Sequence, residues 1–347
     1  MEENHNKNCI MYKYIPTKLC KVSRIIAIGD IHGDIKLALK LLKLAKVIRI
    51  INKKLVWIGK DTYVIQTGDQ LDSCRPINKQ PCYTSFNKNK KGNIKKSDIH
   101  VLKLFTRLDF LAQLHGGRVI SLLGNHEIIN VLGNMFYVSQ DDIEYFSNIE
   151  ERIKLFKPGN EFAKLLGCTR LLFVIIGNNF FCHGGLVKQF IDKIKKDNED
   201  PITTLNRLND IFKKWLITGK KEDKKLINLT TMENESMSDT GNSILWERIL
   251  GSISSNLPIS DIECTNNFVP IMKMLDLQNM IIGHTPQIFI NKTSINGTCD
   301  KHLWRIDTAL SHAFDEIIKE VCENKFKKKL QVLEIIDDNI FNIISEK

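Results

Sequence analysis

The most informative stretch of this chain is Arg24-Ile25-Ile26-Ala27-Ile28-Gly29-Asp30-Ile31-His32-Gly33-Asp34. Its apolar first half predicts a short buried strand, and its glycines predict a turn directly after it. Asp30 and His32 are two residues apart, so in an extended segment their side chains project to the same side. They could therefore hold one ion together. Asp34 precedes the apolar-rich segment 35–47, where it is placed to cap the first helix.

The same arrangement, an apolar run that closes at a glycine-containing turn with polar side chains, recurs along the chain. The further turns are Gly68-Asp69-Gln70-Leu71-Asp72, Gly124-Asn125-His126-Glu127, His183-Gly184-Gly185 and Gly283-His284-Thr285. Loops converge at the carboxyl ends of strands in α/β sheets, so we expect these side chains to meet. One such turn alone more often has a structural role. Five in order favour a shared functional site, because independent coincidences multiply.

Strand and helix signals alternate early in the chain, and hairpin signals follow later. We expect strands at 24–28, 63–66, 118–123, 171–176, 180–182, 280–282, 303–306 and 331–336, and a helix through 101–112 that ends at Gly116-Gly117. This order predicts a mixed α/β fold of two sheet layers covered by helices.

Three segments stand apart from this pattern by their polar composition. Residues 1–22 are interpreted as a polar extension, and residues 23–345 as one domain with a peripheral helical insertion near 186–242. Within that insertion, 219–242 predicts a mobile polar stretch. Residues 76–97, rich in Pro, Asn, Lys and Gly, predict an exposed loop.

The composition suits a globular protein with a substantial core, since 43% of the 347 residues are hydrophobic and 26% are charged. No apolar stretch approaches the roughly 20 residues of a membrane span, and no signal-peptide pattern precedes the first strand, so we expect a cytoplasmic location. The nine cysteines have no zinc-site spacing. We therefore expect reduced thiols, including Cys74 and Cys82, for which a disulfide is the weaker alternative.

The net charge of +10 comes largely from lysine, with runs at 88–96, 220–225 and 325–329. A basic surface could attract nucleic acid or acidic proteins. These lysines are scattered through polar loops, many beside acids, and no aromatic side chains alternate with them. A solvated surface is the better interpretation, and nucleic-acid binding is disfavoured.

The residues at the five turns have the chemistry of divalent-cation ligands. Asp69 has two oxygens and can bridge two cations, whereas Asn125 offers a carbonyl oxygen and His183 and His284 offer imidazole nitrogens. Such a mixed oxygen and nitrogen set suits Mn, Fe or Zn better than Mg or Ca. Two cations about 3.5–4 Å apart would activate a bridging hydroxide for in-line attack on a phosphate ester.

Further side chains near these turns could complete a hydrolytic site. His126 directly follows Asn125 and can protonate the leaving oxygen, with Asp72 orienting its imidazole. Arginine suits phosphate because its planar fork matches two oxygens, so Arg248 and Arg75 are the candidate phosphate contacts. For Arg75, a plain surface role is an equal alternative.

Two acidic residues at the turns are assigned structural roles. Glu127 is expected to stabilise a helix start. Asp307 follows a strand and could reach the site, but turn formation is the simpler interpretation.

Taken together, these motifs resemble the metallophosphoesterases of the phosphoprotein phosphatase type, and within them the bacterial-type, Shewanella-like branch. The features that carry the branch resemblance are Asp34 after Gly33, Gly116-Gly117-Arg118-Val119, Asn130-Val131-Leu132-Gly133-Asn134, Leu245-Trp246-Glu247-Arg248, Gly283-His284-Thr285-Pro286-Gln287 and Trp304-Arg305-Ile306-Asp307. The resemblance covers roughly residues 24–336.

The resemblance implies a calcineurin-like β-sandwich flanked by helices, with a dimetal site at one edge of the sandwich. Two ligand groups are implied: Asp30, His32 and Asp69 for one cation, and Asp69, Asn125, His183 and His284 for the other. It likewise implies that His126 is the acid, that Asp72 is its partner and that Arg248 is a phosphate arginine. The family usually has Asp-Arg-Gly where this chain has Asp72-Ser73-Cys74. Arg75 is therefore a possible substitute for the missing arginine.

The leading functional hypothesis is a phosphatase that acts on phosphoserine, phosphothreonine or phosphotyrosine in a phosphoprotein or phosphopeptide. Related metal centres also hydrolyse dinucleoside polyphosphates and other small phosphate esters, which is the second hypothesis. The third is a catalytically inactive phosphoprotein-binding module. The intact set of ligand residues argues against it.

Overall fold

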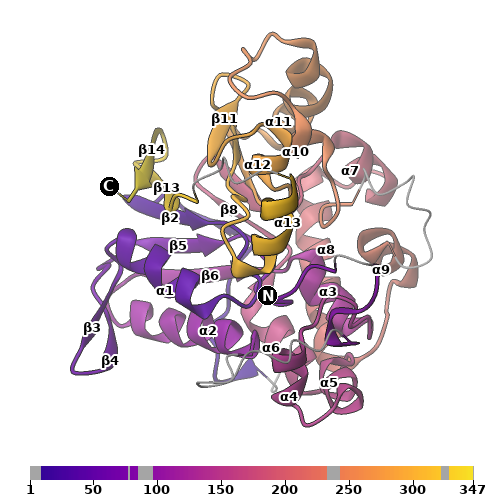
Figure 1. The fold of residues 1–347 in the computed structure, drawn as a ribbon. Coiled ribbons are helices and arrows are strands. Elements are labelled where there is room, and N and C mark those ends of the chain that lie inside the picture. Colours follow the sequence, from indigo (N-terminus) through magenta and orange to yellow (C-terminus); the bar gives the residue numbers. More distant parts are fainter. Residues whose placement is uncertain (1–8, 77–78, 85–96, 233–242, 322–327, 347) are drawn as a thin grey trace.

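A computed structural model of the chain describes residues 9–76, 79–84, 97–232, 243–321 and 328–346. Two six-stranded sheets form its centre (Figure 1). The first has the order β14 (Ile340–Ser345), β13 (Gln331–Ile336), β2 (Arg24–Ile28), β5 (Tyr63–Gln66), β6 (Arg118–Leu122) and β7 (Arg170–Leu171). The second has the order β1 (Lys18–Leu19), β8 (Phe173–Ile176), β9 (Asn179–Cys182), β10 (Asn279–Ile282), β12 (Leu303–Arg305) and β11 (Asn296–Thr298). The expected strands are present, except that the strand expected at 171–176 is divided between β7 of the first sheet and β8 of the second.

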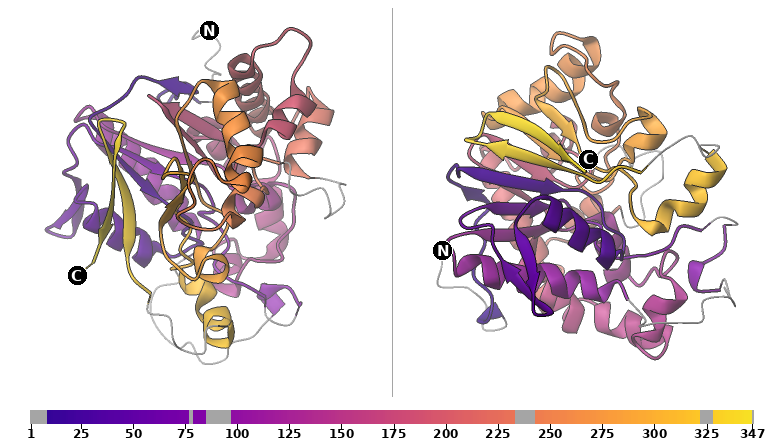
Figure 2. Two further views of the ribbon diagram at one scale, coloured as in Figure 1. Left: turned by 90° about the horizontal axis from the view of Figure 1, so that it is seen from above. Right: turned by 60° about the vertical axis from the view of Figure 1, so that its left-hand side comes forward.

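Strand direction decides where polar turns can meet. In the first sheet β2, β5, β6 and β7 are parallel, and β13 pairs antiparallel with β2 and β14. Figure 2 shows the β13–β14 hairpin beside β2. In the second sheet β9, β10 and β12 are parallel, whereas β8 and β11 run antiparallel to their neighbours β9 and β12. A separate hairpin joins β3 (Ile48–Ile51) to β4 (Lys54–Trp57).

Alternating side chains of β2 contribute to two different cores. Ile25 and Ala27 pack between the sheets with residues such as Phe181 and Ile281. Ile26 and Ile28 face the other way, against α1 (Ile35–Leu44) and α2 (Ile99–Gln113). This alternation is the two-residue period of a strand buried on both faces. The fold is the expected mixed α/β sandwich.

The first two helices begin and end as their sequences predict. The Asp34 carboxylate accepts the backbone N–H of Leu37 at 2.9 Å and caps α1. Helix α2 ends before Gly116, whose φ of 79° lies in the left-handed region that glycine favours.

The central part of the chain is helical and more deeply buried than its sequence indicates. It contains α3 (Asn125–Val131), α4 (Gln140–Glu144), α5 (Ile149–Phe156), α6 (Glu161–Thr169), α7 (Lys188–Ile194), α8 (Pro201–Thr218) and α9 (Lys224–Thr231). One face of α8 belongs to the largest core cluster, through Leu208, Phe212 and Trp215. These buried positions are three or four residues apart, which is the spacing of one face of an amphipathic helix. The domain boundaries, with an insertion near 186–242, stay a prediction.

The remaining helices are short. They are α10 (Ile249–Ser252), α11 (Val269–Leu275), α12 (Gln287–Ile290) and α13 (Asp315–Val321). Much of the predicted 76–97 loop, part of the 219–242 stretch and most of two lysine runs lie outside the described residues. Among the described helices, none combines the length and apolar character of a membrane span.

The cysteines correct the expectation of reduced thiols. The part of the chain that the structure describes contains three disulfides: Cys9–Cys168, Cys74–Cys82 and Cys264–Cys299. Their Cα–Cα distances of 5.4, 6.2 and 5.7 Å lie in the range of disulfides. Two of these pairs are 159 and 35 residues apart, so folding brings them together and no local spacing could reveal them.

Candidate metal centre

The predicted ligands converge because each follows the carboxyl end of a parallel strand. Asp30, Asp69 and Asn125 come after the neighbouring strands β2, β5 and β6 of the first sheet. His183 and His284 come after the neighbouring strands β9 and β10 of the second sheet. The site is therefore assembled by both sheets at one edge of the sandwich, as sites in α/β proteins commonly are.

Asp69 lies at the middle of this arrangement. Its Oδ2 is 3.6 Å from Nε2 of His32, and its Oδ1 is 3.3 Å from Nε2 of His183. Two groups of donor atoms share it, one with His32 and His126 and one with His183 and His284, each within 4.8 Å. A carboxylate whose two oxygens face different ligand groups is placed to bridge two cations.

The remaining donors adjoin these groups. Asp30 Oδ2 is 3.8 Å from Nε2 of His32, and both Asp30 oxygens accept the backbone N–H of His284. Oδ1 of Asn125 is 2.9 Å from Nε2 of His183. The structure thus brings together all six residues that the turns suggested. Their roles as ligands stay a prediction.

Two imidazoles favour cation binding over ordinary burial. Nδ1 of His183 lies 2.9 Å from the carbonyl oxygen of Thr67, so it donates there and leaves Nε2 to face Asp69 and Asn125. Nε2 of His284 is buried with no hydrogen-bond partner. Burying an unpaired polar atom is costly. A cation bound among these donors would satisfy it, so the residues present fit a metal.

The pKa shifts follow from burial and from crowding of charge. Burial, followed by the charges of Asp307 and Asp69, raises the pKa of Asp30. Burial, then an arginine, lowers the pKa of both His32 and His284, which keeps them neutral as metal ligands require. Burial opposes ionisation of Asp69, but the nearby histidines outweigh it and lower its pKa.

His126 has the geometry of a proton donor. Its Nδ1 lies 2.6 Å from Oδ2 of Asp72, and its Nε2 points toward Asp69 at 3.9 Å. The other Asp72 oxygen accepts Nδ2 of Asn130 at 2.8 Å. Asp72 is therefore held at both oxygens and is placed to orient the imidazole. Its role as the partner of an acid stays a prediction.

Glu127 does more than begin a helix. Its buried carboxylate accepts the backbone N–H groups of Gly124, Asp69, Gln70 and Leu71. It thereby joins the turn after β6 to the turn after β5. Gly124 permits this close approach, because a Cβ there would lie 2.1 Å from Oδ1 of Asp69.

Ser73 stands where the family usually has an arginine, and its side chain turns away from the site. Ser73 donates through Oγ to the carboxylate of Asp142 and lies 2.8 Å from Oγ of Ser139. Arg75 instead reaches the centre, with Nη2 2.6 Å from Nε2 of His32. The same Nη2 is 2.9 Å from Nδ1, so the guanidinium lies across the imidazole ring. A cation at His32 would repel this positive charge.

Two aromatic residues that the sequence did not single out flank this arginine. The guanidinium carbon of Arg75 lies 4.6 Å from the ring centroid of Phe314 and 5.6 Å from that of Tyr137. Phe314 also packs against His32, and Tyr137 against His126. An aromatic residue in a loop resembles a core residue in sequence, so no signal marked them. Arg248 lies beside the second ligand group, where its Nη1 donates to the His284 carbonyl at 3.0 Å.

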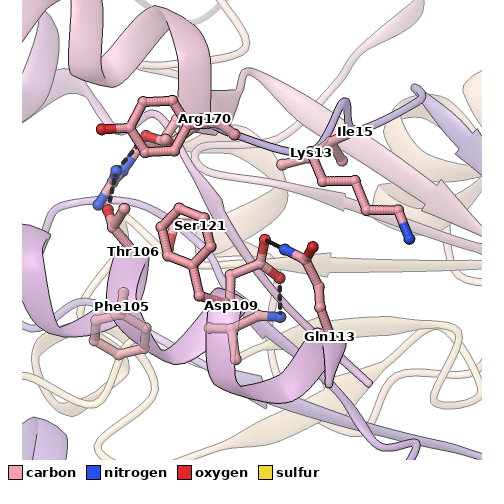
Figure 3. A pocket seen from close by; sticks show the side chains of 12 residues that line it. Lys13, Ile15, Phe105, Thr106, Asp109, Gln113, Ser121 and Arg170 are labelled. Carbon is pink, nitrogen blue, oxygen red and sulfur yellow. Dashed lines mark hydrogen bonds between the residues drawn. The ribbon is translucent and has the colours of Figure 1, made fainter. Parts of the chain in front are cut away.

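A small hollow elsewhere does not offer comparable chemistry. It lies against α2, and the residues labelled in Figure 3 are Lys13, Ile15, Phe105, Thr106, Asp109, Gln113, Ser121 and Arg170. Asp109 accepts Nε2 of Gln113 at 2.7 Å, and Arg170 donates to Oγ1 of Thr106 at 2.7 Å. These groups are already paired within the protein, so we interpret the hollow as structural.

The fold and this centre agree with the comparisons to known proteins. Residues 23–287 match the calcineurin-like phosphoesterase family, and the chain belongs to that family. An uncharacterized protein of Acanthamoeba polyphaga mimivirus is 37% identical over 255 residues, which cover 68% of this chain and 95% of that protein. Shewanella-like protein phosphatase 2 of Arabidopsis thaliana is 24% identical, over 89% of this chain and 77% of the relative.

One further relative and one solved structure extend this picture. Shewanella-like protein phosphatase 1 of Plasmodium berghei is 29% identical, over 83% of this chain and 67% of the relative. The crystal structure of a cold-active protein-tyrosine phosphatase from a psychrophilic Shewanella species superposes with a TM-score of 0.65 at 19% identity. It covers 96% of this chain and 83% of its own. That likeness shows the fold alone.

Proposed function

We propose that this phosphoesterase is a dimetal-dependent protein phosphatase that hydrolyses phosphomonoesters of phosphoserine, phosphothreonine or phosphotyrosine. The observation that carries the proposal is the buried Asp69 carboxylate between two groups of donor atoms, with the His126–Asp72 pair beside it. The names of the Arabidopsis and Plasmodium relatives support a phosphoprotein as the substrate.

The chain's residues divide into two groups of metal ligands that share Asp69. We assign Asp30 and His32 to one cation, and Asn125, His183 and His284 to the other. The mixed donors favour Mn, Fe or Zn. When bound, two such cations neutralise phosphate charge and make a water molecule acidic enough to supply the nucleophile.

The remaining residues handle the proton and the phosphate. Nε2 of His126 holds the proton that the leaving oxygen takes when its bond to phosphorus breaks. Asp72, 2.6 Å from Nδ1, stabilises the protonated ring. We assign Arg75 and Arg248 to the phosphate oxygens, since both guanidinium groups border the metal groups and can pair with an anion.

The test begins with enzyme stripped of metal by a chelator and reloaded with Mn²⁺. Turnover of phosphopeptides, diadenosine polyphosphates and a simple aryl phosphate is then compared. We expect metal-dependent turnover, fastest on phosphopeptides. Preference for the diadenosine compounds would contradict a protein substrate, and metal binding without any turnover would contradict an enzyme.

Replacing the proposed acid tests the mechanism. In His126→Asn we expect kcat on phosphopeptides to fall by roughly 10²–10⁴, the usual contribution of a positioned acid. The loss should be smaller on nitrophenyl phosphate, whose leaving group needs no proton. The exposed His115→Asn is the matched control. A near-normal kcat in folded His126→Asn would refute this role.

The cytoplasmic location expected from the sequence stays a prediction, and the three disulfides weigh against it. Disulfides persist mainly in oxidising compartments. Thiol labelling of protein taken directly from its native source, without reductant, would show whether these cysteines are oxidised there. Fully reduced thiols would agree with the cytoplasm.

A further inference from the structure

Asp307 lies beside the metal groups although the sequence favoured a turn-forming role for it. It follows β12, and its carbonyl accepts the backbone N–H of Gln287 at 3.0 Å. On one side Ile306 donates to the Ile282 carbonyl at 2.9 Å, two residues before His284. On the other side, a Cβ on Gly29 would lie 3.2 Å from the Asp307 nitrogen. Asp307 therefore sits between the turns that carry Asp30 and His284.

Its two carboxylate oxygens have different surroundings. Oδ1 accepts the backbone N–H of Ala309 at 2.9 Å, which is the turn contact that the sequence suggested. Oδ2 is buried with no hydrogen-bond partner, and the residue as a whole is 1% exposed. A turn-forming aspartate needs only the first contact. The second oxygen is left unsatisfied at a place where burial makes that costly.

The charges around Asp307 indicate what this oxygen faces. Asp30 and Asp69 are close enough for the three carboxylates to repel one another, and the positive groups opposite are Arg75 and His183. Three buried carboxylates this close together form an environment that a cation would stabilise.

We propose that Asp307 is a third carboxylate of the metal centre, which raises cation affinity on the side of Asp30 and His32. This inference rests on the proposed dimetal function. In this proposal Asp307 is a positioning residue: its charge strengthens cation binding, and the residue does not itself contact the substrate. The alternative is that Asp307 only forms its turn.

Asp307→Asn separates the two roles. The amide oxygen can still accept from Ala309 and the side chain keeps its volume, whereas the negative charge is lost. Asp307→Ser is the second variant, because its hydroxyl can also accept that N–H. The control is Asp338→Asn, a buried acid at the other end of β9 that accepts from Asn178 and Asn179.

The readout is Mn²⁺ binding to full-length, metal-stripped protein, measured by calorimetry and by the Mn²⁺-induced rise in Tm. We expect two ions in the wild type and in Asp338→Asn. In Asp307→Asn and Asp307→Ser, one ion should bind at least tenfold more weakly, with a smaller rise in Tm.

The outcomes distinguish this inference from the proposed function. Wild-type affinity for both ions in either folded Asp307 variant would overturn the inference and leave the proposed function intact. A wild-type protein that binds no Mn²⁺, Fe²⁺ or Zn²⁺ would overturn the proposed function itself.

Discussion

At the scale of single residues, the candidate site is marked by unusual backbone conformation. His32, Asp69, Asp72 and His284 have φ angles of 44°, 53°, 66° and 63°, in the left-handed region. Such conformations cost on the order of 1–3 kcal/mol each and persist only where surrounding contacts hold them. Glu127 supplies several of those contacts, since it accepts three successive N–H groups from Asp69 onward.

Arg75 gives a prediction at this scale. If its guanidinium binds phosphate, Arg75→Ala should weaken inhibition by inorganic phosphate, because hydrogen bonds to charged groups contribute about 1.5–3 kcal/mol. The inhibition constant should rise roughly tenfold or more. Steady-state inhibition assays measure it, with the exposed Arg107→Ala as control. An unchanged constant would return Arg75 to the role of a packing residue between Phe314 and Tyr137.

Glu247 gives a prediction about pH. Burial raises the pKa of its carboxyl to about 8, against the opposing hydrogen bonds from the backbone of Leu250 and Ile249. The folded state then keeps a proton that the unfolded chain has released above its ordinary pKa near 4.5. Stability should therefore fall as the pH rises from about 4.5 to 8.

Glu247→Gln removes this titration, so the free energy of unfolding should depend less on pH. Between pH 4.5 and pH 8 the wild type should lose on the order of a few kcal/mol that the variant keeps. Urea unfolding of metal-free protein at several pH values measures the difference. The exposed Glu316→Gln should keep the wild-type slope. Parallel slopes in Glu247→Gln and the wild type would show that this carboxyl titrates normally.

At the scale of elements, helix α5 supports the acid pair through a buried ion pair. Arg152 donates to both oxygens of Asp98 at 3.0 and 2.7 Å and to Oδ1 of Asn130 at 3.0 Å. Asp98 accepts the backbone N–H of Asp72 at 3.0 Å. The partner of His126 is thus connected to α2, α3 and α5.

Arg152→Met should leave the Asp98 charge buried and unpaired. We expect a loss of about 3–5 kcal/mol in the free energy of unfolding. The double variant Arg152→Met/Asp98→Asn should recover much of that loss, because no lone charge remains. Equal destabilisation of the single and double variants in denaturant unfolding would contradict this account of the pair.

The sequence could predict the elements whose signals are local. An apolar run that ends in Gly-Asp or Gly-Asn-His indicates both a strand and a candidate ligand within a few residues. The strands and the six candidate donors could therefore be predicted from the sequence. The contacts of Arg152 with Asp98, the Cys9–Cys168 disulfide and the burial of α8 join distant parts of the chain. The proposals for Arg75 and Asp307 also needed the structure, because only the direction of a side chain separates a candidate site residue from a surface or turn residue.

At the scale of the whole molecule, the candidate metal centre draws its residues from both sheets. Asp30, Asp69 and Asn125 belong to turns of the first sheet, and His183 and His284 to turns of the second. A cation shared by Asp69, Asn125 and the two histidines would therefore connect both layers of the sandwich. Its binding energy would stabilise the assembled fold, since the unfolded chain does not hold these donors together.

Metal removal should accordingly lower the stability of the entire domain. At a free cation concentration 100 times Kd, binding at one site stabilises the folded state by about 2.7 kcal/mol. With a Tm change of roughly 2–4 °C per kcal/mol, Mn²⁺ should raise Tm by roughly 5–10 °C over chelator-treated protein. Calorimetry under non-reducing conditions keeps the disulfides intact and isolates this effect. Asp69→Asn should lose most of the Mn²⁺-induced rise in Tm, because the substitution weakens both ligand groups. A full rise in that variant would show that the stabilising ion binds elsewhere.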